Sequence, residues 1–306
     1  MENSFLTTYS GEIAALSTAI LFGFTSMMFT LAGRELNSSA LVNRTRLLVA
    51  VILMALFHWL TFGSLLPVGA DASHWFWLAL SGLIGLALGD AFLFQAFVMI
   101  GPRLSMLMMA LAPVIATILA WIFLGEFLNS QQLIGIAITV LGVFWVISER
   151  GTPSTREISP RGYLFGILFG LGGAVGQAGG MVTAKLGLTD NFPAFSGNMI
   201  RMLAAAVVIW GFTIVRGQVG QGFVRLRQHP RALVIISAAS LIGPVIAVWL
   251  SLLAVQHAPV GIVSTLIGLT PIFLIPITYV IFHEKPTVRA VLGTVVAFAG
   301  TALLFL

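Results

Sequence analysis

Most of this chain consists of apolar stretches of about twenty residues, each bounded by glycine, proline or a short polar cluster. A helix rises about 1.5 Å per residue, so about twenty apolar residues cross the hydrocarbon core of a bilayer. Only 8% of the residues are charged, whereas a typical soluble domain has about 25%. The sequence therefore predicts an integral membrane protein built from helices.

The boundaries of the apolar stretches predict ten membrane spans. Connections of some length are expected only at residues 63–74, 149–161 and 216–231. The expected spans are residues 12–33, 40–62, 75–98, 102–124, 130–148, 162–184, 194–215, 232–256, 260–282 and 287–305.

The second half of the chain repeats the pattern of the first half. A proline, a glutamate and two glycines in the fourth and fifth expected spans recur at the same spacing in the ninth and tenth. Each member of the second set follows its counterpart by 158 residues: Pro113, Glu126, Gly135 and Gly142 become Pro271, Glu284, Gly293 and Gly300. SGLIG at 81–85 has ASLIG as its counterpart, again 158 residues later.

Five spans in each half is an odd number, so the halves are expected to cross the membrane in opposite senses. Inverted repeats of this kind are common in secondary transporters, with the substrate site near the midplane between them. The sequence thus predicts an all-α membrane protein of ten transmembrane helices, arranged as two inverted five-helix repeats around a central cavity. The repeats are expected at 12–148 and 162–306, joined by the linker 149–161. A duplicated scaffold without transport is the alternative.

Both halves resemble a known family. LAPVIATILAWIFLGEFLNSQQLIGIAITVLGV and LTPIFLIPITYVIFHEKPTVRAVLGTVVAFAGTALL are similar to the EamA-type repeat of the drug/metabolite transporter superfamily. LFG at 21–23 resembles its first-helix element, and GDAFLFQAFVMIGPRLSML resembles the GD…F…A…GP pattern of a subgroup. HEKPT at 283–287 departs from the more usual G-E-R-type element. The resemblance implies a central cavity, peripheral fifth and tenth helices, and export of a small amphipathic metabolite such as an amino acid.

Asp90 is the only carboxylate well inside an expected span. An ionisable group there costs about 2.5–3.5 kcal/mol on insertion scales and faces protein or a water-filled cavity. Arg46 is expected at a similar depth on the neighbouring span, so we predict an Asp90–Arg46 ion pair. Two interpretations remain: the pair locks two helices together, or Asp90 faces the cavity and binds a cationic group or a proton exchanged for substrate.

Other polar residues inside the spans are candidates for substrate contact. An Asn-x-x-Arg motif occurs as Asn43/Arg46 and again, 155 residues later, as Asn198/Arg201, and this spacing places both residues on one helical face. The arginines contact an anionic substrate group, or they extend to lipid headgroups or cap carbonyls of a neighbouring helix. Gln177 lines the cavity or hydrogen-bonds another helix.

Gln95 lies about 140° around the helix from Asp90, so it does not share that face. Trp249 is more typical of packing than of a cavity wall, and both roles remain open. Four prolines free backbone carbonyls and kink helices, so they are candidate gates: Pro113, Pro244, Pro271 and Pro276. Glu126 and Glu284 are expected to cap helix ends or to pair at the interface. Glycines at four-residue spacing predict close helix packing: Gly162, Gly166 and Gly170, then Gly172, Gly176 and Gly180.

The basic residues predict the orientation in the membrane. The face that holds both termini has Lys185, with Arg201 just inside it. The opposite face collects Arg34, Arg103, Arg150, Arg156, Arg161, Arg216, Arg225, Arg227, Arg231, Lys285 and Arg289. Short basic loops stay cytoplasmic, so both termini are expected outside a bacterial-type plasma membrane.

The sequence argues against enzymes, cofactors and nucleic acid. It has no cysteine and no P-loop, and ALGD (87–90) lacks the G-x-G-D of aspartyl intramembrane proteases. ALSG and AFSG miss G-x-S-G, and His283-Glu284 lacks the second histidine of H-E-x-x-H. We expect no catalytic residues, metal or cofactor. The expected partners are a small-molecule substrate, a proton or other coupling ion, and lipid, for a monomer or homodimer. A lipid flippase or scramblase is an alternative function.

Overall fold

The computed structural model describes residues 9–147, 160–273, 276 and 288–304, and its regular elements in these ranges are all helices. Six helical runs are long and apolar enough to cross a membrane: Ser10–Leu36, Ala40–Phe62, Ala72–Ala96, Arg161–Gly187, Ala194–Val215 and Pro230–His257. Shorter apolar helices occupy the remaining expected spans: Ala112–Leu124, Ser130–Trp145, Val260–Phe273 and Val291–Ala302. Residues 149–159 of the expected linker, and Glu284 with the HEKPT stretch, lie outside the described residues.

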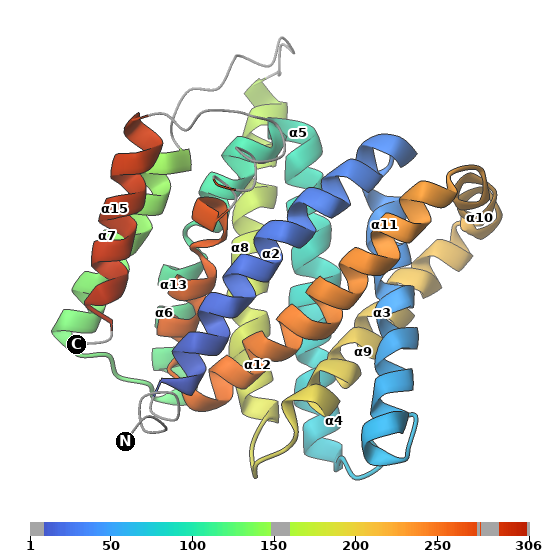
Figure 1. The fold of residues 1–306 in the computed structure, drawn as a ribbon, viewed down its shortest axis with the longest axis horizontal. Coiled ribbons are helices and arrows are strands. Elements are labelled where there is room, and N and C mark those ends of the chain that lie inside the picture. Colours follow the sequence, from blue (N-terminus) through green and yellow to red (C-terminus); the bar gives the residue numbers. More distant parts are fainter. Residues whose placement is uncertain (1–8, 148–159, 274–275, 277–287, 305–306) are drawn as a thin grey trace.

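The helices fall into two series, one from each half of the chain (Figure 1). The first series is α2 (Ser10–Leu36), α3 (Ser39–Phe62), α4 (Ala72–Ser81), the π-helical turn η1 (Gly82–Gly89), α5 (Asp90–Met109), α6 (Ala112–Leu124) and α7 (Ser130–Ile147). The second is α8 (Pro160–Gly187), α9 (Ala194–Val215), α10 (Val219–Gln228), α11 (Pro230–Ser240), the π-helical turn η2 (Leu241–Ala247), α12 (Val248–His257), α13 (Val260–Ile267) and α15 (Val288–Ala302).

Corresponding helices of the two series run in opposite directions (Figure 1). α2 begins at the lower side of the molecule in this view and runs upward, whereas α8 begins at the upper side and runs downward. The start of α2 and the end of α15 therefore share one side, which we call the lower side; the side where α2 ends and α8 begins is the upper side.

The last helix of each series lies at the edge of the molecule, as the family resemblance implies for the fifth helix of each repeat. α7 and α15 pack against each other there (Figure 1). They approach so closely that a Cβ added to Gly142 would lie 2.5 Å from the backbone nitrogen of Ala297, and one added to Gly135 would lie 2.9 Å from the carbonyl oxygen of Gly300. The glycines that repeat in the sequence thus allow this pair to form.

Close packing through glycines also joins the two halves at the centre, where α8 packs against η1 and α5. A Cβ on Gly176 would lie 2.5 Å from Cα of Gly89, and one on Gly180 would lie 2.9 Å from Cα of Gly85. The Ser81 hydroxyl donates to the Gly180 carbonyl at 2.5 Å. The predicted close packing of the glycine ladder on α8 is confirmed, and it brings the backbones of the two halves into contact.

Wide π-helical turns occur at equivalent places in the two halves: η1 lies between α4 and α5, and η2 lies between α11 and α12. η1 and η2 both lie in the stretch that repeats with an offset of 158 residues. Pro244 lies inside η2 and has no N–H to donate, which breaks the α-helical ladder there. π-helical turns are rare and frequently occur at functional sites.

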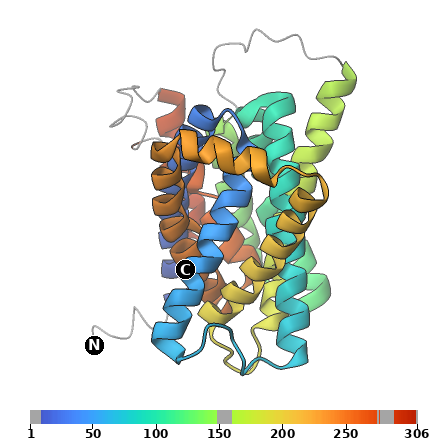
Figure 2. The same ribbon diagram turned by 90° about the vertical axis from the view of Figure 1, so that its right-hand side faces the viewer.

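One expected boundary is wrong. The third span was expected to end at residue 98, but α5 continues through the Gly-Pro pair at 101–102 to Met109. The helix is interrupted by a turn at Ala110–Leu111 instead. Proline can kink a helix without ending it. The connection 216–231 contains α10, which runs across the upper side of the molecule rather than along the long helices (Figure 2).

We expect Gly176→Ala to lower the melting temperature of the purified protein, because the new methyl group meets the backbone of Gly89. Overpacking of this kind costs about 1–3 kcal/mol. Gly211→Ala on the exposed face of α9 is the matched control, since nothing lies within 4 Å of its added Cβ. Thermal unfolding in detergent measures both, and an equal melting temperature for the two variants would contradict the close backbone contact.

Candidate functional site

The predicted ion pair between Arg46 and Asp90 is present. Nη2 of Arg46, on α3, binds Oδ2 of Asp90, the first residue of α5 after η1. Asn43, one turn earlier on α3, accepts a hydrogen bond from Nε of Arg46 at 2.8 Å. The two charged side chains are only 15% and 18% exposed. The first Asn-x-x-Arg motif therefore orients its own arginine toward the aspartate.

Two aromatic rings enclose the same guanidinium. Its central carbon lies 5.7 Å from the ring centroid of Phe29 on α2 and 5.8 Å from that of Phe94 on α5. A cation within about 6 Å of an aromatic face is attracted to it. Arg46 thus connects α2, α3 and α5, and the ring faces with the carboxylate offset the cost of removing its charge from water.

The second Asn-x-x-Arg motif has a different environment. Arg201 on α9 is 5% exposed, so it does not extend along the protein surface toward lipid headgroups. The Asp90 charge acts on it, although none of the ion pairs between described residues includes Arg201. Asn198 donates from Nδ2 to the carbonyl of Pro244 in η2 at 2.8 Å. This asparagine thus caps a carbonyl of a neighbouring helix, whereas the capping expected of the arginines stays a prediction.

The remaining polar candidates do not join this cluster by any described contact. Gln177 is half-buried on α8, and Gln95 is exposed on α5. Trp249 on α12 meets Phe195 edge to face, with 6.1 Å between ring centroids, and packs against the largest apolar cluster. Their roles toward a substrate stay predictions.

The four prolines occupy different settings. Pro113 lies in the first turn of α6, directly after the break at Ala110–Leu111, and Pro271 follows the equivalent break at Gly268–Leu269. Pro244 lies within η2, and Pro276 is exposed beside residues outside the described ranges.

The two turns that interrupt the helices, at Ala110–Leu111 and Gly268–Leu269, lie close to each other where the halves meet. A Cβ on Gly268 would lie 3.4 Å from the Pro113 ring. The two residues also line a small pocket together with residues of α7 and α13. Breaks between helical segments, rather than kinks within helices, are the irregular features at these two prolines.

A clasp joins the two halves at the lower side, and we define it by Glu126, Lys185, Ala258 and Val260. Lys185 at the end of α8 lies 2.6 Å from Oε1 of Glu126 and donates to the Ala258 carbonyl at 2.9 Å. The backbone N–H of Val260, at the start of α13, donates to Oε2 of Glu126 at 2.8 Å. The expected capping role of Glu126 is confirmed. The contribution of Lys185 was missed, although it was the one lysine placed on this side.

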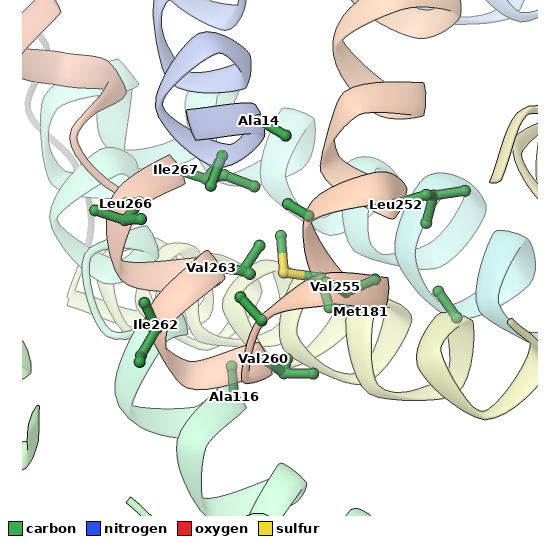
Figure 3. Packing of buried hydrophobic residues seen from close by; sticks show 14 of the residues in the cluster. Ala14, Ala116, Met181, Leu252, Val255, Val260, Ile262, Val263, Leu266 and Ile267 are labelled. Carbon is green, nitrogen blue, oxygen red and sulfur yellow. The ribbon is translucent and has the colours of Figure 1, made fainter. Parts of the chain in front are cut away.

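Apolar side chains pack together around Val260, which is part of the clasp (Figure 3). They come from α2, α6, α8, α12 and α13, and they belong to the largest buried cluster, which also includes residues of α4, α7, α9 and α15. The cluster includes Ala14, Ala116, Met181, Leu252, Val255 and Val263, each at most 5% exposed. We call this group the lower plug. Together the clasp and the plug close the lower side.

Other polar groups near the same side make local contacts. Asp71 caps α4 by accepting the backbone N–H of His74 at 2.8 Å, and this hydrogen bond lowers the pKa of its carboxyl. Its contribution is present above the ordinary carboxyl pKa and is lost as the pH falls through the lowered value. The ring of His74 stacks on Phe192, with 4.3 Å between centroids, and Gln256 donates to the Phe192 carbonyl at 2.8 Å.

We expect Lys185→Gln to open the lower side more often, because a partly buried charge pair is lost while Glu126 stays in place. The chain has no cysteine, so Val263→Cys in the plug, where Val263 is 0% exposed, serves as the single reporter. Its maleimide labelling rate should rise about tenfold with Lys185→Gln, the change that corresponds to about 1.4 kcal/mol. The control Arg216→Gln, on an exposed residue at the end of α9, should leave the rate unchanged. Equal rates in all three backgrounds would show that the clasp does not control access.

These features define a multi-pass helical membrane protein made of two similar halves, with a largely buried ion pair inside the first half and a closed side where the halves meet. The chain belongs to the EamA-like transporter family, whose model matches residues 9–148 and 164–306, one match to each half. This is a family of transporters. The match is consistent with membership of the drug/metabolite transporter superfamily.

Two other comparisons add to this result. A search of curated proteins finds no match. A solved structure, described only as "Crystal structure of protein", matches with a TM-score of 0.72 over 96% of each chain at 17% identity. At this identity the likeness concerns the fold.

Proposed function

We propose that the protein is a secondary transporter that moves a small amphipathic metabolite, such as an amino acid or a related compound, out of the cell. The buried Arg46–Asp90 pair carries this proposal. In a chain of a transporter family, a charged pair within the membrane-spanning helices is the place where a substrate group or a proton can exchange.

Alternating access follows from the arrangement of the two halves. The helices of the units 12–148 and 162–306 run in opposite directions, and we propose that together they make ten spans around the pathway. The clasp and the plug hold the lower side closed, so release at that side requires the Glu126–Lys185 pair to separate. The breaks before Pro113 and Pro271 allow half-helices to tilt as this happens.

Asp90 is the proposed coupling residue. While it is ionised, it holds Arg46 and ties α3 to α5. A proton on Asp90 removes the negative charge and leaves Arg46 with Asn43 and two aromatic rings. Protonation therefore weakens the contact between two helices of the first half. A proton that reaches Asp90 from one side of the membrane would release the Arg46–Asp90 contact. Loss of that proton to the other side would let the contact form again.

We expect Asp90→Asn to abolish uptake driven by a pH gradient in proteoliposomes, because an amide cannot take up or release the proton. The screen uses radiolabelled amino acids with and without the gradient. Asp190→Asn is the matched control: the same chemical change falls on an exposed residue with a φ of 52°, where asparagine is well tolerated. Folded Asp90→Asn protein that accumulates substrate as wild type does would make Asp90 structural and the protein a facilitator.

The same vesicles test the alternative that the protein moves lipid. Fluorescent phospholipids that become accessible to a membrane-impermeant quencher only when the protein is present would favour a flippase or scramblase. Amino-acid uptake without lipid movement would favour the transporter.

We propose that the upper side is cytoplasmic in a bacterial-type plasma membrane, with both termini outside. Arg225 and Arg227 on α10, and Arg216 and Arg231 beside it, lie on the upper side (Figure 2). Phe223 and Val224 on α10 are exposed apolar side chains. Such a helix is suited to the surface of a leaflet with anionic lipid.

Single cysteines in the naturally cysteine-free chain test this orientation. Thr189→Cys, in the exposed connection between α8 and α9 at the lower side, should react with a membrane-impermeant maleimide in intact cells. Gln221→Cys, exposed on α10, should react only after the membrane is permeabilised. The reverse pattern would place both termini in the cytoplasm.

A further inference from the structure

The two halves differ in one charge at equivalent positions. Asp90 follows η1 in the first half, and the residue 158 positions later, directly after η2, is Val248. Arg46 and Arg201, in contrast, occur in both halves as parts of the same motif. The first half therefore contains an arginine with its counterion, whereas the second half contains an arginine without one.

The structure does not compensate Arg201 from elsewhere among the described residues. The side chain is 5% exposed, and its Nε has no hydrogen-bond partner in the described part of the chain. The charge of Asp90 acts on Arg201, but the Asp90 carboxylate is already bound by Arg46. Two cations thus share one anion inside the molecule, and this cluster carries a net positive charge. A buried charge without a partner is strongly destabilising.

Arg201 lies at the contact between the two halves, beside the wide turn η1. Gly85 of η1 faces the guanidinium, and a Cβ added there would lie 3.6 Å from Nη2. Asn198, one turn earlier on α9, has a buried Oδ1 without a hydrogen-bond partner in the described structure. An unsatisfied donor and an unsatisfied acceptor therefore lie on the same face of α9, next to the wide turn of the other half.

We infer that Arg201 binds a carboxylate group of the transported molecule, which supplies the anion that the second half lacks. The inference rests on the proposed transport function and adds the chemical class of the substrate. A guanidinium offers two parallel N–H groups that match the two oxygens of a carboxylate. Because α9 and η1 belong to different halves, a carboxylate bound here is held where the halves meet.

Purified protein tests this inference with phenylalanine, leucine and methionine as probes. Each is compared with the amine that lacks its carboxylate and the acid that lacks its amino group. The amino acid and the acid should raise the melting temperature of the wild type, and the amine should not. Arg201→Gln should weaken binding of the carboxylate probes at least tenfold. Arg201→Lys, which keeps the charge without the two parallel N–H groups, should bind with intermediate affinity.

The ligand-free melting temperature separates a binding role from a structural one. Arg201→Gln removes an uncompensated buried charge, so it should melt at the same temperature as the wild type or higher. Arg46→Gln removes one partner of a buried pair and should melt lower. Arg216→Gln, on the surface, should change neither stability nor binding. A clear loss of stability in Arg201→Gln would show that the fold already satisfies this guanidinium, and it would overturn the inference.

Other outcomes distinguish this inference from the proposed function. Equal binding of amines and acids, or equal stabilisation by chloride or inorganic phosphate, would overturn the carboxylate site while the vesicle uptake still supports transport. Failure of the wild type to bind and to take up every amino-acid probe would overturn both the site and the proposed substrate class.

Discussion

The structure depends on how three buried charges are arranged among apolar helices. An unpaired ion inside a membrane protein is costly, so Arg46 and Asp90 must meet, and the helices that carry them must be adjacent. Asn43 and the rings of Phe29 and Phe94 complete the surroundings of Arg46. Arg201 remains the group whose charge the described protein does not balance, and for this reason the chemistry of the site concentrates there.

Backbone contact through glycine is the second constraint, and it explains why Arg201 of the second half lies close to the first half. Gly85 and Gly89 let η1 approach α8 until the backbones touch. With larger side chains at these places the halves would stand further apart, and Arg201 would be too far from the first half for the Asp90 charge to act on it. The clasp at Glu126 and Lys185 then closes one side of an assembly whose centre is already held by glycine contacts.

The sequence predicted the membrane class, the duplication, the ion pair and the glycine packing, because each depends on residue type and spacing. It misplaced the end of the third span, since a Gly-Pro pair at 101–102 does not always end a helix. It also did not show that Arg201 lies near Asp90 or that Lys185 pairs with Glu126. Both contacts join segments far apart in the chain, and only the packing of one half on the other creates them. Residue spacing in the sequence also gives no information on how these charged side chains act on a substrate.

The wide turn η1 sets the direction in which Asp90 points. In an α-helix each residue advances the direction of its side chain by about 100°, and a π-helical turn places more residues in one turn than the α-helix does. This difference accumulates over the eight residues of η1, so the direction of the Asp90 side chain toward α3 depends on the wide turns that precede it. The winding of this stretch therefore constrains the chain as firmly as the identity of Asp90 does: the same eight residues wound as an ordinary α-helix would point the entire following helix in another direction.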